Sequence, residues 1–210
     1  MKRLGIDVSY CQNRVDWKKV KAAGVQFVMV RVGYCFNDGT LHTDRMFKSH
    51  IEGATAVGLD VGVYLYSYAT STSAAKKAAQ AVLRAVKPYK LTYPIAFDIE
   101  YEREYPMKAK ATNTEVSAAF LREIERAGYY AMLYCSKDFL DNYLIPERLT
   151  TFDKWIAQYA SKCTSKHRHG IWQYSGSGKV NGIPVAVDFN YAYKDYPAII
   201  RRAKLNKLEE

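Results

Sequence analysis

Two carboxylates stand two positions apart at the end of a short apolar segment, YPIAFDIE, which covers residues 93–100. Side chains alternate along a strand, so Asp98 and Glu100 are predicted to point to one face while the apolar residues between them occupy the other. Clustered carboxylates are costly to bury unless they serve a purpose. The segment therefore predicts a strand with one face for packing and one face for acid–base chemistry.

Other strand-like segments carry chemically competent residues on the corresponding face. Asp7 ends the first such segment, and Asp188 lies in the last. The further candidates are a guanidinium, expected to hold the acids in place, and a set of aromatic rings: Arg31, Tyr64, Tyr66, Tyr134, Trp155, Tyr159, Trp172 and Tyr174. Carboxylates among aromatic rings suit glycosidic bond cleavage, in which one acid protonates the leaving oxygen and others stabilise positive charge at the sugar carbon.

Structural explanations compete with these assignments for single residues. Asp7 or Asp188 alone is equally well explained as a hydrogen-bonding residue at a strand end, and the aromatic residues as barrel filling or core. For Asp98 and Glu100 together the chemical interpretation is favoured.

The elements that position these residues follow a repeating order of helix, glycine and strand. Helices are predicted over residues 17–23, 44–57, 73–86 and 113–127, and strands over 4–9, 27–32, 61–68, 93–100 and 129–134. After a short helix at 137–143 the chain becomes strand-rich, with segments at 153–159, 170–174 and 185–191. A basic helix over 197–208 is expected to dock on the outside. This order predicts an α/β fold, an irregular (β/α) barrel of about eight strands with fewer than eight helices.

Length and charge limit the organisation and the partners. A chain of 210 residues that is 49% hydrophobic can bury a full core, and we expect one catalytic barrel domain over residues 1–210, with its core at about 3–195 and a basic helix and tail at 196–210. The net charge of +10 favours an anionic partner. The basic residues are scattered and no nucleic-acid-binding motif is present, so nucleic acid is not expected.

No metal or cofactor is expected from the motifs. The four cysteines, Cys11, Cys35, Cys135 and Cys163, lack the spacing of a zinc site. Free thiols are predicted, with a bridge between Cys11 and Cys35 as the alternative. The chain also lacks the glycine-rich motifs that bind nucleotides and dinucleotides.

Seven segments in order carry a resemblance to a known family: GIDVS, VKAAGVQFVMVRVGY, VGVYLYSYA, PIAFDIE, KWIAQY, IWQYS and VDFNY. They span the chain from Gly5 to Tyr191, and together they resemble the glycoside hydrolase family 25 lysozymes, the N-acetylmuramidases of bacteria and their phages. The resemblance implies an irregular α/β barrel that hydrolyses the β-1,4 bond between N-acetylmuramic acid and N-acetylglucosamine in bacterial peptidoglycan.

The resemblance also implies roles for the four acids. Glu100 falls on the general acid and Asp98 on the carboxylate two positions before it, while Asp7 and Asp188 fall on the acids of the first and last strands. We expect the 2-acetamido group of the substrate to attack the sugar carbon with Asp98 supporting it, and Asp7 and Asp188 to raise the proton affinity of Glu100. The strand spacing fits either a retaining or an inverting outcome.

Peptidoglycan is thus the expected partner of a monomeric enzyme without a membrane span. The start of the chain, MKRLGIDVSY, is predicted to be a strand and not a signal peptide. We expect action on the extracellular cell wall. Either the protein is released from the cytoplasm in the manner of phage enzymes, or the sequence is part of a longer secreted protein. The alternatives are another N-acetylglucosaminide hydrolase, such as a chitinase, and a non-catalytic wall-binding module.

Overall fold

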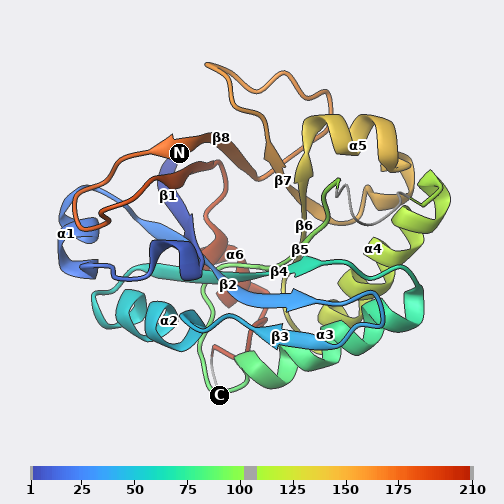
Figure 1. Cartoon of the computed structure of the whole chain (residues 1–210), viewed down its shortest axis with the longest axis horizontal. Coiled ribbons are helices and arrows are strands. Elements are labelled where there is room, and N and C mark those ends of the chain that lie inside the picture. Colours follow the sequence, from blue (N-terminus) through green and yellow to red (C-terminus); the bar gives the residue numbers. More distant parts are fainter. Residues whose placement is uncertain (1, 102–107, 209–210) are drawn as a thin grey trace.

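The computed structural model describes residues 2–101 and 108–208 (Figure 1). Nine strands in these ranges form one sheet: β1 (Arg3–Val8), β2 (Phe27–Cys35), β3 (Leu41–Thr43), β4 (Asp60–Ser67), β5 (Ile95–Asp98), β6 (Ala131–Ser136), β7 (Asp153–Ala157), β8 (Ile171–Gly178) and β9 (Val187–Ala192). The same ranges contain six α-helices and two short 3₁₀ helices: α1 (Trp17–Ala22), α2 (Phe47–Ala56), α3 (Thr72–Val86), α4 (Lys110–Arg126), α5 (Lys137–Tyr143), α6 (Tyr196–Arg202), η1 (Tyr10–Gln12) and η2 (Pro146–Leu149).

Eight of these strands close into a barrel. Strands β1, β2, β4, β5, β6, β7 and β8 are neighbours in that order, and each pair is parallel. Strand β9 closes the ring because it pairs antiparallel with both β8 and β1, and β3 forms a hairpin on β2 outside the ring. The predicted irregular barrel with fewer helices than strands and a strand-rich last third is confirmed.

Local sequence signals account for the helix boundaries. The side chain of Asp16 accepts a hydrogen bond from the backbone N–H of Lys19 at the start of α1. The side chain of Ser71 accepts one from the backbone N–H of Ala74 at the start of α3. Gly24 and Gly58 follow α1 and α2 with φ of 91° and 72°, the left-handed backbone that ends many helices. The two glycines thus end α1 and α2 and let the chain return to the sheet.

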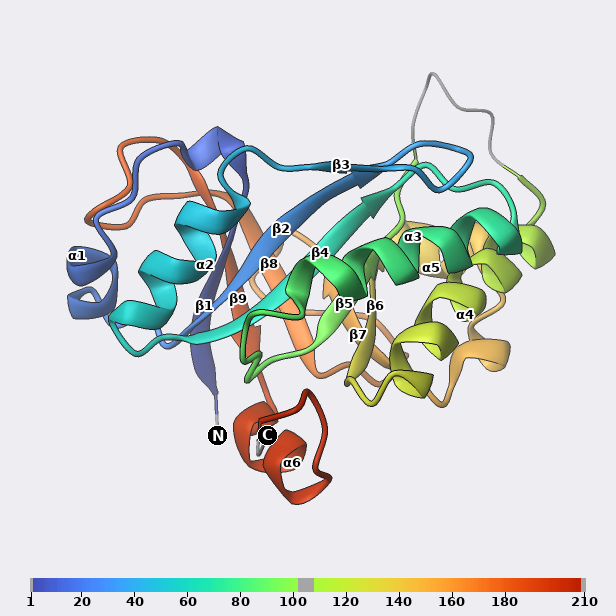
Figure 2. The same cartoon turned by 90° about the horizontal axis from the view of Figure 1, so that it is seen from below.

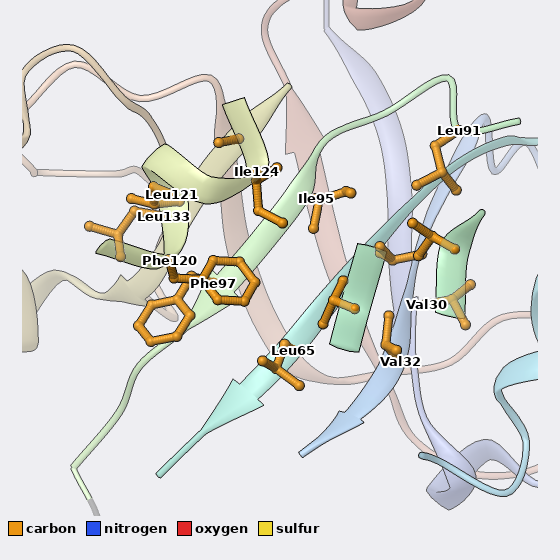
Figure 3. Packing of buried hydrophobic residues seen from close by; sticks show 14 of the residues in the cluster. Val30, Val32, Leu65, Leu91, Ile95, Phe97, Phe120, Leu121, Ile124 and Leu133 are labelled. Carbon is orange, nitrogen blue, oxygen red and sulfur yellow. The ribbon is translucent and has the colours of Figure 1, made fainter. Parts of the chain in front are cut away.

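Apolar residues form two layers, one on each side of the barrel wall. The outer layer packs one face of the strands against the helices, and Figure 3 shows Phe97 of β5 against Phe120 of α4, with Val30 and Leu65 further along the same layer. The inner layer fills the barrel and includes Trp155. Alternation along each strand sends apolar residues outward to the helices and leaves the interior positions for larger or polar side chains.

The last helix differs from the expectation of an outside docking element. Helix α6 ends at Arg202, and Tyr196 and Ile200 are fully buried in the inner layer. Figure 2 shows α6 lying across the end of the barrel beside the N-terminus. It occupies this place because its apolar side chains complete the floor of the barrel, opposite the carboxyl ends of the parallel strands.

Strand β3 is absent from the sequence prediction, since three residues carry too little pattern and depend on pairing with β2. All four cysteines are free thiols in the structure, so Cys11 and Cys35 form no bridge. Cys35 is buried, and its sulfur lies 3.4 Å from the hydroxyl oxygen of Ser67. The predicted thiol state is confirmed.

Candidate active site

The predicted acids gather at one end of the barrel. Asp98 is the last residue of β5, and Glu100 follows it by two positions, beyond the strand. Asp7 stands near the carboxyl end of β1 and pairs directly with Asp188 in the β1–β9 ladder. Because β9 runs antiparallel to β1, its first residues lie at the same end of the barrel as the last residues of the parallel strands, and this places Asp188 beside Asp7.

Asp7 is the centre of a buried hydrogen-bond network. Its Oδ2 accepts a hydrogen bond of 2.7 Å from the Asn190 amide and one of 2.9 Å from the Gln173 amide. The Asn190 oxygen in turn accepts from the Trp155 indole N–H at 2.7 Å, and the Gln173 oxygen accepts from the Tyr134 hydroxyl at 2.8 Å. Each amide thus uses both its oxygen and its nitrogen, which fixes the orientation of Asp7 inside the barrel.

Asp7 and Asp188 form the first acid pair, and burial and like charge set its protonation. Burial, followed by the neighbouring Asp188 carboxylate, raises the pKa of Asp7 well above its usual value, and the amides of Asn190 and Gln173 oppose this rise. Burial also raises the pKa of Asp188, against a hydrogen bond with Asp7. This pair therefore binds a proton more readily than two isolated carboxyls.

Asp98 and Glu100 form the second acid pair. Asp98 is only 3% exposed, and burial, followed by the charge of Glu100 and a hydrogen bond with it, raises the pKa of Asp98 well above its usual value. Glu100 is half-buried. Within the described residues, the Oδ1 atom of Asp98 is buried and has no hydrogen-bond partner, so a buried acceptor stands ready for a donor.

Arg31 is held by an acid outside the predicted set. Its Nε and Nη2 atoms each lie 2.8 Å from Oδ2 of Asp44, whose side chain is fully buried. Asp44 also accepts hydrogen bonds from the backbone N–H groups of Tyr10 and Met46. The guanidinium lies 4.8 Å from the centre of the Tyr10 ring. The charge of Arg31 lowers the pKa of Asp98, but burial, Glu100 and Asp7 together outweigh it.

Four predicted site residues form a row across neighbouring strands. Tyr66 is paired with Asp98, Asp98 with Tyr134, and Tyr134 with Trp155. Tyr64 lies one layer deeper, and its ring meets that of Trp155 edge-on at 5.9 Å between centroids. In parallel strands paired residues point to the same face, so these aromatic rings surround Asp98 inside the barrel.

Tyr159 lies at the rim of the site. The residue is 63% exposed, and its hydroxyl donates to the Gln173 oxygen at 3.3 Å. An exposed ring anchored to the buried network is accessible to a ligand that enters the barrel mouth.

Trp172 and Tyr174 are not brought together with the acids. They flank Gln173 on β8, and Gln173 points into the barrel, so the alternation of the strand directs both rings outward. The Tyr174 ring stacks on Tyr191 at 4.4 Å, and the Trp172 indole donates to the backbone oxygen of Gln158. The expected convergence of all aromatic residues therefore fails for these two, because β8 presents its other face to the interior.

Gln173, Asn190 and Asp44 are the polar residues of the site that sequence reasoning did not select. Asn190 shares a strand face with Asp188, and this alternation was the available signal. Gln173 lies in a strand where a polar residue between apolar neighbours is equally consistent with an exposed face. Its burial depends on the closure of the barrel by β9.

The described residues match neither the pattern of a metal site nor that of a membrane-crossing helix. No group of three or more His, Cys, Asp or Glu side chains in residues 2–101 and 108–208 is arranged to hold a metal ion. No helix in the same ranges has both the length and the apolar character of a membrane-crossing helix.

Comparison with known proteins identifies relatives of this barrel. The chain is 27% identical over 187 residues to the autolytic lysozyme of Clostridium acetobutylicum, and the match covers 89% of this chain and 54% of that protein. Among solved structures it resembles the modular autolysin LytC of Streptococcus pneumoniae in complex with a synthetic peptidoglycan ligand, with 29% identity and a TM-score of 0.79 over 91% of this chain and 47% of that one. A bacterial lysozyme from Streptomyces coelicolor shares the fold, with 20% identity, a TM-score of 0.77 and 98% of each chain covered. This chain spans about half the length of the first two relatives.

The family model of the glycosyl hydrolases family 25 matches residues 6–183, which is most of the chain. The match confirms the family expected from the seven sequence segments. The chain belongs to the glycosyl hydrolases of family 25.

Proposed function

We propose that this protein hydrolyses the β-1,4 bond between N-acetylmuramic acid and N-acetylglucosamine in bacterial peptidoglycan, with Glu100 as the general acid and Asp98 as the supporting carboxylate. The observation that carries the proposal is the hydrogen-bonded Asp98–Glu100 pair at the mouth of the barrel, where burial and the second carboxylate raise the pKa of Asp98. A pair of this kind retains a proton at a pH where an isolated carboxyl has lost it.

Accessibility assigns the two roles within the pair. A proton donor must touch the glycosidic oxygen, and Glu100 is half-buried whereas Asp98 is 3% exposed. Glu100 is therefore the carboxyl that meets the leaving oxygen. Asp98 lies deeper and is suited to orient a group of the bound sugar.

The unpartnered Oδ1 of Asp98 suggests which sugar group that is. The N–H of a 2-acetamido group would donate to this atom, and donation to a carboxylate lowers its pKa. The proton shared by the pair would then move to Glu100. The acetamido oxygen attacks the sugar carbon as the bond to the leaving oxygen breaks, and Glu100 gives its proton to that oxygen. Water then opens the resulting cyclic ion, and Glu100 takes a proton from that water.

The other site residues position the substrate in this proposal. Asp7 and Asp188 add negative charge that keeps the second pair protonated, in line with the contribution of Asp7 to the raised pKa of Asp98. Tyr159 offers an exposed aromatic face at the rim, and such faces stack on sugar rings. The outward-facing Trp172 and Tyr174 would contact substrate only outside the barrel mouth.

The remaining expectations are part of the same proposal. We propose one catalytic barrel domain over residues 1–210, a monomeric state, and action on the extracellular cell wall. The lysozyme and autolysin names of the relatives support the wall as the place of action.

The test combines product analysis with one isosteric change. Purified peptidoglycan is digested, the new reducing ends are reduced with borohydride, and the reduced sugar is identified by mass spectrometry. Reduced N-acetylmuramic acid supports the proposal, whereas reduced N-acetylglucosamine or release of chito-oligosaccharides from chitin contradicts the assigned bond. Absence of new ends on several wall types points to a binding module.

Glu100→Gln is expected to lower turnover by about 10²–10⁴-fold, because the amide cannot donate the catalytic proton. Glu52→Gln is the matched control, since Glu52 is exposed on α2 and lies outside the site. Both variants should keep the melting temperature of the parent within a few degrees. Near-normal turnover of Glu100→Gln would refute its role as the general acid.

A further inference from the structure

A pocket of about 310 Å³ lies on the outer side of the barrel, between α3, α4 and η2. Figure 2 shows α3 and α4 packed side by side outside the sheet. The pocket is lined by Thr72, Lys76, Thr114, Glu115, Ala118, Ala119, Arg122, Arg126 and Arg148. None of these residues belongs to the candidate active site, which opens at the end of the barrel.

The shape of this pocket, the α3–α4 pocket, follows from small residues on α4. Ala118 and Ala119 are buried where the two helices meet, and their methyl groups leave a hollow that larger side chains would fill. Arg122 and Arg126 project from the next turns of α4, because residues four apart share one face of a helix. Long cationic side chains thus stand around a shallow floor.

The charge of the α3–α4 pocket is unbalanced. Four cationic side chains from three elements line it, against the single carboxylate of Glu115. Arg126 forms an ion pair with Glu123. Among the described residues, no carboxylate lies within 4.0 Å of the charged nitrogens of the other three: Lys76, Arg122 and Arg148. Arg122 lies near enough to Glu125 for its charge to oppose the rise that burial causes in the pKa of that carboxyl. The cations that converge on the hollow still outnumber the carboxylate that lines it, so they create a positive potential that attracts an anion.

We propose that the α3–α4 pocket binds the phosphate groups of an anionic cell-wall polymer, a chain of polyols joined by phosphodiesters. Guanidinium groups bind phosphate oxygens through paired N–H donors. Two arginines of the pocket, Arg122 and Arg148, have no carboxylate within 4.0 Å among the residues that the structure describes. The choice of a wall polymer rests on the proposed function, because an enzyme that digests peptidoglycan works among such chains. Binding here would hold the enzyme on the wall while the barrel mouth stays free.

The composition of the pocket favours this ligand over nucleic acid. Single-stranded nucleic acids are held by aromatic rings that stack on the bases in addition to cations. The described residues that line the pocket include no aromatic side chain. Phosphate recognition without a stacking platform suits a polymer whose repeating units are small and polar.

The test is calorimetric titration of the full chain with a synthetic decamer of glycerol phosphate at low salt. The variant Arg122→Gln/Arg148→Gln removes two cations of the pocket, and the control Arg201→Gln/Arg202→Gln removes the same charge from exposed positions of α6. Each contact between full charges at close range in water contributes about fivefold to affinity, so the pocket variant should bind about 30-fold more weakly. The control should change affinity by less than about threefold.

Three outcomes would overturn the proposal. The first is an absence of binding to the decamer, and the second is an equal loss in both variants, which would indicate general charge attraction. The third is tighter binding of a single-stranded oligonucleotide, or of vesicles containing an anionic phospholipid, with the same sensitivity to Arg122→Gln/Arg148→Gln. Inorganic phosphate, titrated alone, should bind only at a far higher concentration than the decamer.

The proposed hydrolysis is tested separately with the same variants. On peptidoglycan stripped of phosphate polymers, both double variants should match the parent, because neither touches the barrel mouth. On intact walls only the pocket variant should lose activity. A failure of decamer binding therefore leaves the hydrolytic proposal standing, and a failure of hydrolysis leaves the binding result interpretable.

Discussion

Replacing Asp7 by Asn changes the charge of the site with almost no change in shape. The oxygen of the new amide can accept the hydrogen bonds that Gln173 and Asn190 now donate to Asp7. Its NH₂ group faces the Asp188 carboxylate, which contacts Asp7 in the native protein. In the native protein the hydrogen bond between Asp7 and Asp188 requires a proton on the acid pair, whereas the amide of the variant donates to Asp188 without taking up a proton.

This substitution is expected to stabilise the fold at pH 7. Holding this proton costs the native fold about 1.4 kcal/mol for each pH unit between 3.9 and the raised pKa, so the variant avoids about 1.5–3 kcal/mol once one to two units are passed. For a chain of this length such a gain raises Tm by about 3–12 °C. We expect Asp7→Asn to lose hydrolytic activity at the same time, because it removes one of the four proposed catalytic acids.

The gain must depend on pH with a definite sign. Burial, and then Asp188, raises the pKa of Asp7 in the folded state, whereas the unfolded chain loses this proton near pH 3.9. Between pH 3.9 and the raised pKa the folded state binds more protons than the unfolded state. The native free energy of unfolding therefore falls in this window as the pH rises. Asp7→Asn lacks this titration, so its advantage should grow from about pH 4 upward until the raised pKa is passed.

Urea unfolding followed by tryptophan fluorescence at pH 4 to 8 measures this difference. Asp16→Asn is the control, because Asp16 is an exposed helix cap whose pKa is lowered, mainly by the hydrogen bond from the Lys19 backbone. Its stabilising contribution is present above pH 3.9 and is lost as the pH falls, and Asn caps helices as well as Asp does. If Asp7→Asn were less stable than the native protein at pH 7, or if its gain were constant from pH 4 to 8, the electrostatic reasoning would be refuted.

Two further substitutions test the packing of the site. Gln173→Leu removes a donor to Asp7 and leaves the buried Tyr134 hydroxyl without its acceptor; the free energy of unfolding should fall by about 2–4 kcal/mol in urea titration, and an unchanged value would show that the network contributes nothing. Gly5→Ala places a Cβ in steric conflict with the Phe27 ring and should lower the free energy of unfolding by about 1–3 kcal/mol. Adding Phe27→Leu should recover part of that loss, and no recovery would contradict the clash.

Short-range patterns account for the elements that were predicted well. The short helix expected at residues 137–143 is α5 with the same bounds, because Ser136 caps its start through the Phe139 N–H. The acidic strand was also found, although β5 is shorter than the predicted segment and leaves Glu100 beyond its end. Boundaries shift in this way because strand pairing, and not residue preference alone, decides where a strand stops.

Long-range contacts account for the parts of the site that were missed. The bond from Gln173 to Asp7 joins residues 166 positions apart, and that from Asn190 joins residues 183 apart. A polar residue in a strand becomes buried only when another part of the chain covers its face. The spacing of residues within the strand does not predict which face will be covered. The same limit explains Arg31, whose partner Asp44 lies in the short segment between β3 and α2 and not in a strand.

The sequence by itself determined the α/β class, the alternation that sets Asp98 and its neighbours on one strand face, and the seven segments that identify the family. These are local properties, because side-chain direction repeats every two residues in a strand. Tertiary structure alone decided that β9 runs antiparallel beside β1 and so sets Asp188 against Asp7. It also decided that Trp172 faces outward, since the face that a strand turns to the interior depends on register with its neighbours.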